Sequence, residues 1–120
     1  MTEREWQKQI VGLARGYGWS VFHVGDSRRQ VGGGKMVGDR QIAGFPDLTL
    51  VHPARGFVFA ELKTDKGKLS DKQVETLDVM AAASTRCANA VKVHVWRPSD
   101  LDTLVVPCLA GTKGVRVVGW

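Results

Sequence analysis

Three charged residues occur within segments whose other residues are mostly apolar. Glu61 and Lys63 are two positions apart in the segment 57–63, and Asp47 begins the segment 47–52, fourteen positions before Glu61. Both segments have the composition of β-strands, and side chains two apart on a strand project from the same face. If the short turn between them closes a hairpin, Asp47 lies near the Glu61 end of its neighbour. Two carboxylates and one ammonium group would then meet in one small site.

Charges in such a place need an explanation, because burying an ion is costly unless it is paired or binds a metal. One explanation is structural: Lys63 forms an ion pair with Glu61 or Asp47 at the rim of the sheet. The other is catalytic: the two carboxylates hold Mg²⁺ through a partly hydrated shell. Lys63 would then orient or deprotonate the attacking water and help to neutralise charge as a phosphodiester is hydrolysed.

The elements that would position these residues follow from capping signals and hydrophobic periodicity. The order helix, three strands, helix, strand predicts an α/β domain whose last strand returns over a crossover helix. A length of 120 residues fits a single domain, residues 1–120. The expected helices cover about residues 3–17, 70–84 and, capped by Ser99, 100–104; the expected strands cover 19–24, 47–52, 57–63, 91–96 and 115–118.

The charge balance favours a polyanionic partner. Seventeen basic and 12 acidic side chains give a net charge of +5. Residues 25–44 contain six of the 14 glycines and show no clear period, which is typical of a functional or a disordered loop. We expect four basic residues of this loop to contact DNA phosphates, namely Arg28, Arg29, Lys35 and Arg40. The alternative is a solvated loop that is basic but binds nothing.

Other classes of protein are disfavoured by what the sequence lacks. No apolar run reaches the roughly 18 residues that a membrane span needs, and the first residues lack the apolar region of a signal peptide. These features predict a cytoplasmic protein without membrane contact. The two cysteines, Cys87 and Cys108, form no CxxC pair, which disfavours a zinc site.

The pattern of motifs resembles a known nuclease family. Phe45-Pro46-Asp47, followed after fourteen positions by Glu61-Leu62-Lys63, resembles the PD-(D/E)XK nuclease signature. The surrounding residues make the resemblance more specific, since they are similar to the VRR-NUC family of small phage and bacterial stand-alone nucleases. The resemblance covers about residues 2–104, and its motifs are 2–7, 18–19, 44–48, 60–63, 67–73 and 96–100.

This resemblance implies metal-dependent phosphodiester hydrolysis on an αβββαβ core with a central mixed sheet flanked by helices, the restriction-endonuclease-like arrangement. Asp47 and Glu61 would be metal ligands and Lys63 the catalytic lysine, with Mg²⁺ as the ion and Mn²⁺ as a substitute. Glu3 would be the helix carboxylate that many members have. The backbone carbonyl of Leu62 could be a further metal ligand.

Two of the implied site residues also have local explanations. Glu3 projects onto the apolar stripe of the first helix, whereas Glu5 points to solvent and caps the helix together with Thr2. Glu3 is therefore the better candidate for the site, although an acid at a helix N-terminus is favourable in itself. Gln73 matches the glutamine that follows the third family motif, but a capping box with Ser70 explains it about as well.

Three hypotheses about function follow from these observations. The leading hypothesis is a Mg²⁺-dependent DNA endonuclease, with selectivity for branched, flapped or junction DNA as a further expectation. Selectivity of this kind often needs two active sites in fixed geometry, so we expect a homodimer or a higher homo-oligomer. The second hypothesis is a non-catalytic DNA-binding module that retains the nuclease fold. The third is a structural protein whose charges form an ion-pair network at the rim of the sheet.

Overall fold

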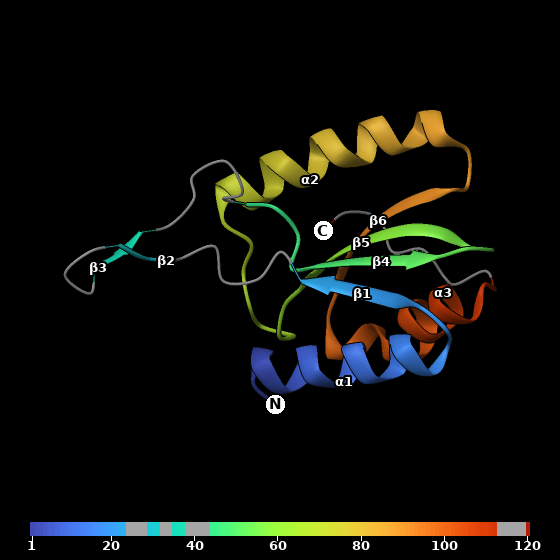
Figure 1. Cartoon of the computed structure of the whole chain (residues 1–120), viewed down its shortest axis with the longest axis horizontal. Helices are drawn as coiled ribbons and strands as arrows, with labels where there is room; N and C mark the ends of the chain where they lie inside the picture. Colours follow the sequence, from blue (N-terminus) through green and yellow to red (C-terminus); the bar gives the residue numbers. More distant parts are fainter. Residues whose placement is uncertain (24–28, 32–34, 38–43, 113–119) are drawn as a thin grey trace.

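The structure, a computed structural model, describes residues 1–23, 29–31, 35–37, 44–112 and 120. Its centre is a four-stranded sheet whose strands lie in the order β1 (Ser20–His23), β4 (Leu48–His52), β5 (Gly56–Leu62), β6 (Val91–Trp96) (Figure 1). Strand β4 is antiparallel to both β1 and β5, and β6 runs parallel to β5. The sheet is therefore mixed, as the sequence predicts.

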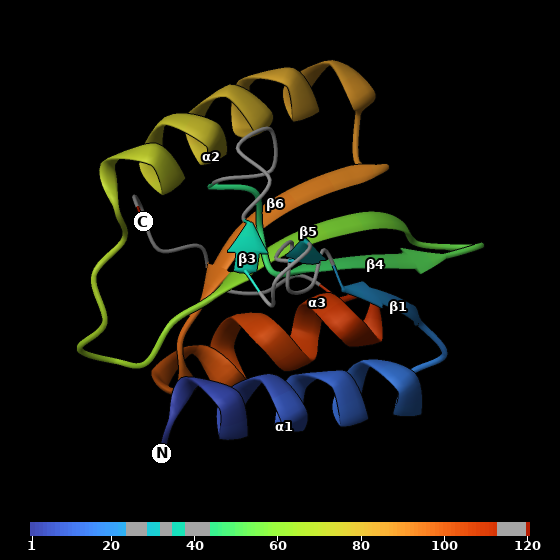
Figure 2. The ribbon, with the colours of Figure 1, turned by 60° about the vertical axis from the view of Figure 1, so that its left-hand side comes forward.

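Helices cover both faces of this sheet. Helix α1 (Glu3–Gly16) and the short α3 (Val106–Ala110) lie on one face, and α2 (Asp71–Ser84) lies on the other (Figures 1 and 2). The larger buried cluster joins the sheet to α1 and α3, and a smaller cluster lies beneath α2. The elements α1, β1, β4, β5, α2 and β6 follow in the expected order, which confirms the mixed α/β architecture. None of the described helices has the length and hydropathy to span a membrane.

Both long helices begin at the predicted capping boxes. The Thr2 hydroxyl accepts from the backbone N–H of Glu5, and the Glu5 carboxylate accepts from the N–H of Thr2, both at 3.1 Å. Ser70 and Gln73 make the same reciprocal pair at the start of α2. These bonds satisfy N–H groups that the first helical turn leaves free, so the sequence fixes where each helix begins.

Two segments differ from the expectation. Within residues 25–44, β2 (Arg29–Val31) and β3 (Lys35–Val37) form a separate antiparallel pair where no regular structure was expected. After β6, helical structure continues to Ala110 through the 3-10 turn Pro98–Asp100, the π-helical turn Leu101–Val105 and α3. Ser99 does not cap it, because the Asp100 carboxylate accepts from the N–H of Arg97 instead. The expected strand at 115–118 lies outside the described residues.

One end of the sheet brings together the elements that matter for the site. The start of β4, the end of β5 and the N-terminal ends of α1 and α2 all lie there (Figures 1 and 2). The backbone carbonyl of Trp96, the last residue of β6, accepts from the indole N–H of Trp6 at 2.9 Å and from the N–H of Lys63 at 3.2 Å. This one carbonyl therefore joins α1, the residue after β5, and β6.

The opposite end of the sheet depends on Gly56, whose φ of +85° favours glycine. A Cβ at this position would lie 2.1 Å from the carbonyl oxygen of Ala90, so Gly56→Ala adds a steric clash to backbone strain. We expect it to lower the free energy of unfolding by at least about 2 kcal/mol, measured by denaturant titration.

Gly12→Ala is the matched control, because a Cβ at this exposed position in α1 meets no atom within 4 Å. This substitution should stabilise the protein by about 0.5–1 kcal/mol. Equal effects of the two substitutions would contradict the close approach of the hairpin to Ala90.

Candidate metal centre

The hairpin between β4 and β5 places two of the predicted carboxylates side by side. Leu48 pairs with Ala60, and the register closes at His52 and Gly56. One step beyond Leu48 along this antiparallel register, Asp47 falls opposite Glu61. The predicted hairpin and the predicted proximity of Asp47 to Glu61 are both confirmed.

Glu3 reaches the same place from the first turn of α1. One carboxylate oxygen from each of Glu3, Asp47 and Glu61 lies within 4.8 Å of the other two. The indole of Trp6, one turn after Glu3, is fully buried and donates to the Trp96 carbonyl, which fixes this end of the helix against the sheet. The inward direction inferred for Glu3 from helical phase therefore agrees with its position.

Glu61 is the buried member of this group, with 1 % of its surface exposed. Its Oε1 accepts from the Gln73 side-chain amide at 3.2 Å, whereas its Oε2 is buried without a hydrogen-bond partner among the described residues. Burial, and then the negative charge of Asp47, raise the pKa of Glu61 to about 9. In the metal-free protein this carboxyl is therefore protonated at neutral pH, and a bound divalent cation would favour its ionised form.

Gln73 serves both of the roles considered for it. Its Oε1 accepts from the N–H of Ser70 at 2.8 Å, which is the capping bond, and its Nε2 donates to Glu61. The two ends of one amide thus link the start of α2 to the carboxylate. The capping box positions the Gln73 side chain, and Gln73 in turn orients Glu61.

Asp47 is oriented by the backbone of the neighbouring strand. Its Oδ2 accepts from the N–H of Leu62 at 2.9 Å. The Leu62 side chain is fully buried in the larger cluster, so Leu62 could contribute to a metal site only through its backbone. A role for its carbonyl oxygen stays a prediction.

Lys63 follows the last residue of β5 and is half-buried. Its charge acts to lower the pKa of Glu61, opposing the larger effects of burial and Asp47, so the two side chains interact electrostatically. Within the described part of the chain, however, Lys63 forms no ion pair with Glu61 or Asp47. This geometry does not support the interpretation of these three charges as a rim ion-pair network.

The structure does not describe the side chains of the four basic residues predicted to contact DNA. Arg28 and Arg40 are outside the described residues, and the backbones of Arg29 and Lys35 belong to β2 and β3. Contact of these four residues with DNA stays a prediction.

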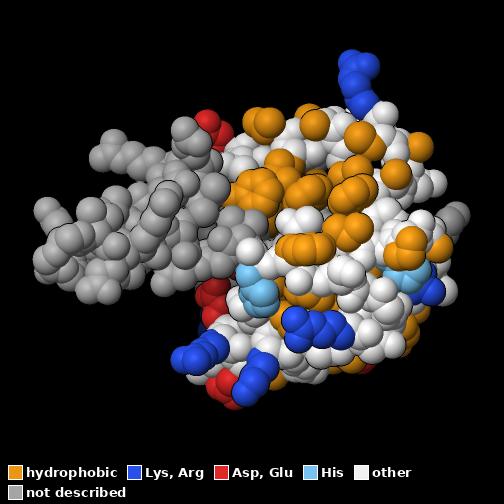
Figure 3. Space-filling model, in the orientation of Figure 1, with side chains coloured by type: hydrophobic (Ala, Val, Ile, Leu, Met, Phe, Trp, Pro, Cys, Tyr) orange, Lys and Arg blue, Asp and Glu red, His pale blue; other side chains and the backbone are white. Residues whose placement is uncertain are grey.

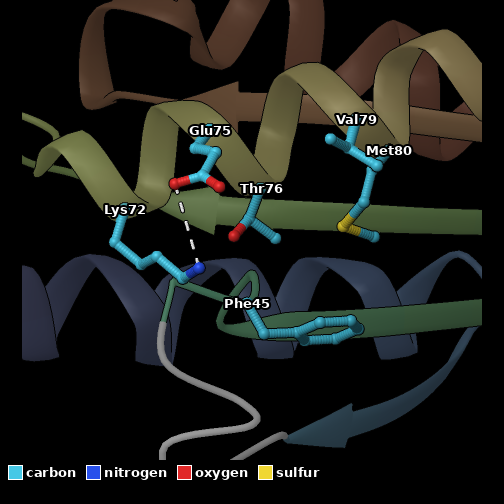
Figure 4. A pocket seen from close by; sticks show the side chains of 6 residues that line it. All are labelled: Phe45, Lys72, Glu75, Thr76, Val79 and Met80. Carbon is cyan, nitrogen blue, oxygen red and sulfur yellow. Dashed lines mark ion pairs between the residues drawn. The ribbon is translucent and has the colours of Figure 1, made fainter.

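A shallow hollow of about 370 Å³ lies between Phe45 and one side of α2, and Lys72 and Glu75 form an exposed ion pair of 3.8 Å at its edge (Figure 4). Thr76, Val79 and Met80 complete the lining. Hydrophobic side chains gather on this side of the molecule, over α2 and the adjoining sheet (Figure 3). None of the predicted site residues that the structure describes lines the hollow, so the carboxylate cluster is a separate feature.

The carboxylates, Lys63 and Gln73 thus occupy one end of a mixed sheet, in the order that the family motifs require. A family model, the VRR-NUC domain, matches residues 38–94. Just under half of the chain is thus similar to the VRR-NUC domain. The resemblance seen in the sequence is therefore confirmed, and this domain implies a nuclease-type function with DNA as substrate.

The VRR-NUC match includes Asp47, Glu61, Lys63 and Gln73, whereas Glu3 lies before it. No curated protein and no solved structure matches the chain. The placement of Glu3 beside the other carboxylates therefore comes from the fold of this chain.

Residues that hold the site in place were harder to foresee. By sequence, Trp6 lies on the apolar stripe of the first helix and Trp96 is a core or sheet-edge aromatic at the end of an expected strand. The segment 96–100 resembles the family, but its sequence indicates no role. A hydrogen bond between two residues 90 positions apart leaves no local trace in the sequence. The sequence signal that could have pointed to the end of β6 was Arg97, a charged residue directly after the expected strand 91–96.

The buried Glu61 predicts how stability depends on pH. Its pKa is raised from an ordinary value of 4.5 to about 9, so between these values the folded state keeps a proton that the unfolded state has lost. The metal-free protein should therefore become less stable as pH rises through this window. Glu61→Gln should flatten the dependence and, at pH 8 with a chelator, raise Tm by about 4 °C or more, which corresponds to ~1 kcal/mol.

The control is Glu75→Gln on the exposed surface of α2, which should leave the pH dependence of Tm unchanged. Parallel pH dependences for wild type and Glu61→Gln would show that Glu61 does not retain its proton.

Proposed function

We propose that this chain is a metal-dependent DNA endonuclease with a PD-(D/E)XK core, in which Glu3, Asp47 and Glu61 hold a divalent ion. The observation that carries the proposal is the burial of Glu61 in a cluster of three carboxylates, with one oxygen of each within 4.8 Å of the other two. Such an arrangement is unfavourable in a protein without a cation, because burial and mutual repulsion both oppose ionisation.

The residues present suit Mg²⁺. Carboxylate oxygens are the hard ligands that this ion prefers, and it is commonly held by one or two carboxylates while it keeps several waters. Glu61 and Asp47 would be the central ligands, Glu3 a third from the first turn of α1, and the carbonyl of Leu62 a backbone ligand. When bound, the ion would supply Lewis-acid activation and neutralise charge on the phosphodiester.

Residues around the carboxylates have distinct tasks in this proposal. Lys63 orients or deprotonates the attacking water and offsets the negative charge that develops on the phosphate. The Gln73 amide holds Glu61, and the N–H of Leu62 holds Asp47, so that both carboxylates keep fixed orientations. In this proposal Lys63 acts on the reacting groups, while the Gln73 amide and the Leu62 N–H orient the two carboxylates.

We also propose that the DNA is bound by the basic residues of the segment 25–44, and that the protein acts on branched, flapped or junction DNA as a homodimer. The net charge of +5 supports binding to a polyanion. Cleavage assays on matched linear and branched substrates test the selectivity, and light scattering tests the dimer.

A non-catalytic DNA-binding module is the competing function. It accounts for the positive charge, but it gives no reason for a buried carboxylate facing two others. DNA binding that is indifferent to divalent metal and is not followed by hydrolysis would favour it.

Single-turnover cleavage of linear, flapped and four-way-junction DNA tests the proposal. We expect wild-type protein to cleave at least one substrate with Mg²⁺ or Mn²⁺ and none with a chelator. Asp47→Ala, Glu61→Gln and Lys63→Met should each lower the rate by about 100-fold or more.

The matched control is Lys66→Met, which removes an exposed lysine three residues from Lys63 and should change the rate less than about twofold. Absence of metal-dependent cleavage by folded wild-type protein on every substrate would contradict the proposed function. Full activity of Lys63→Met would show that the catalytic lysine is misassigned.

A further inference from the structure

Lys63 stands at a point where the sheet no longer holds the chain. Strand β5 ends at Leu62, and the bond from the Lys63 N–H to the Trp96 carbonyl, 3.2 Å long, is its last tie to β6. The next residues, 64–68, form a polar segment that belongs to neither buried cluster. A lysine so placed needs another constraint if its ammonium group is to act at a fixed position.

Arg97 supplies contacts of the right kind. One nitrogen of its guanidinium, Nη1, donates to the carbonyl of Thr64 at 2.6 Å, to that of Gly67 at 2.5 Å and, more weakly, to that of Asp65 at 3.5 Å. The Gly67 N–H in turn donates to the Thr64 carbonyl at 3.1 Å, which closes the turn. The backbone carbonyls of Thr64, Asp65 and Gly67 therefore all lie around the Arg97 guanidinium.

The contact between the two segments is also made in the reverse direction. The Asp65 carboxylate accepts from the backbone N–H of Ser99 at 2.9 Å. The Arg97 N–H donates to Asp100, which shapes the turn that presents Ser99. Hydrogen bonds from Arg97 and from the Ser99 N–H thus join the turn after β6 to the segment 64–67 at two points.

The turn lies close to the Lys63 side chain. A Cβ on Gly67 would lie 2.9 Å from the Thr64 hydroxyl and 3.5 Å from Cδ of Lys63. The backbone gathered by Arg97 therefore runs alongside the aliphatic part of Lys63. Movement of this backbone would change where the ammonium group lies relative to Glu61.

We propose that Arg97 is a positioning residue for Lys63, acting through the turn 64–67. This inference rests on the proposed function, because it assigns Arg97 to the placement of the proposed catalytic lysine. Arg97 itself touches neither the carboxylates nor the reacting atoms.

Arg55 provides a matched control within the same chain. It too is half-buried and donates from its guanidinium to a carbonyl at 2.6 Å, that of Leu109, but it lies in the β4–β5 turn at the other end of the sheet. Replacing either arginine by alanine removes a similar set of bonds. Only Arg97→Ala should affect Lys63.

The first test compares single-turnover cleavage at saturating metal and DNA, at a temperature where all variants are folded. Arg97→Ala should lower the rate by about 10- to 100-fold, Arg97→Lys should restore part of it, and Arg55→Ala should remain within about twofold of wild type. The affinity for Mn²⁺, measured by calorimetry, should not change in Arg97→Ala. Combined with Lys63→Met, Arg97→Ala should cause no further loss, because the group on which it acts is gone.

A wild-type rate in Arg97→Ala, or losses that multiply in the double variant, would overturn the inference. A second measurement does not depend on activity: amide hydrogen exchange at residues 63–67 should become about tenfold faster or more in Arg97→Ala and stay unchanged in Arg55→Ala. Unchanged exchange in Arg97→Ala would overturn the inference by itself. Absence of cleavage by wild type, with exchange altered as expected, would instead locate the failure in the proposed function.

Discussion

The carboxylate of Glu61 is the buried acid of the described structure, and its burial is the constraint on which the site depends. A strand interior excludes water from one of its oxygens, while Asp47 and Glu3 add negative charge nearby. The pKa of Glu61 is raised as a result, so the metal-free centre holds a proton. A divalent ion would replace that proton and reverse the unfavourable electrostatics, which couples metal binding to the stability of the fold.

The remaining structure acts to bring separate segments to this carboxylate. The β4–β5 hairpin supplies Asp47, the capping box of α2 supplies Gln73, and the buried Trp6 indole secures the helix that carries Glu3. The Trp96 carbonyl is shared by α1 and by Lys63, so the end of β6 supports both the acidic and the basic side of the centre. Each contact is an ordinary one, and their convergence at one end of the sheet produces the site.

Much of this arrangement could be predicted from local sequence. Capping boxes gave the starts of both long helices, and the short turn before Gly56 gave the hairpin register that places Asp47 opposite Glu61. Contacts between distant segments could not be predicted, because the bonds of Arg97 to residues 64–67 depend on the parallel pairing of β5 and β6. The helical continuation to Ala110 was missed because the contacts that bury it reach far along the chain: Leu109 lies in the cluster shared with α1, and its carbonyl accepts from the indole N–H of Trp19.

The central claim is that Glu3, Asp47 and Glu61 together hold a divalent ion. Anomalous diffraction from crystals of the protein soaked in Mn²⁺ measures this directly. We expect a Mn²⁺ peak between the three carboxylates, with Glu61 and Asp47 as ligands, and no such peak in crystals of Glu61→Gln. A fully occupied Mn²⁺ site elsewhere, or crystals of wild-type protein without a peak at the carboxylates, would contradict it.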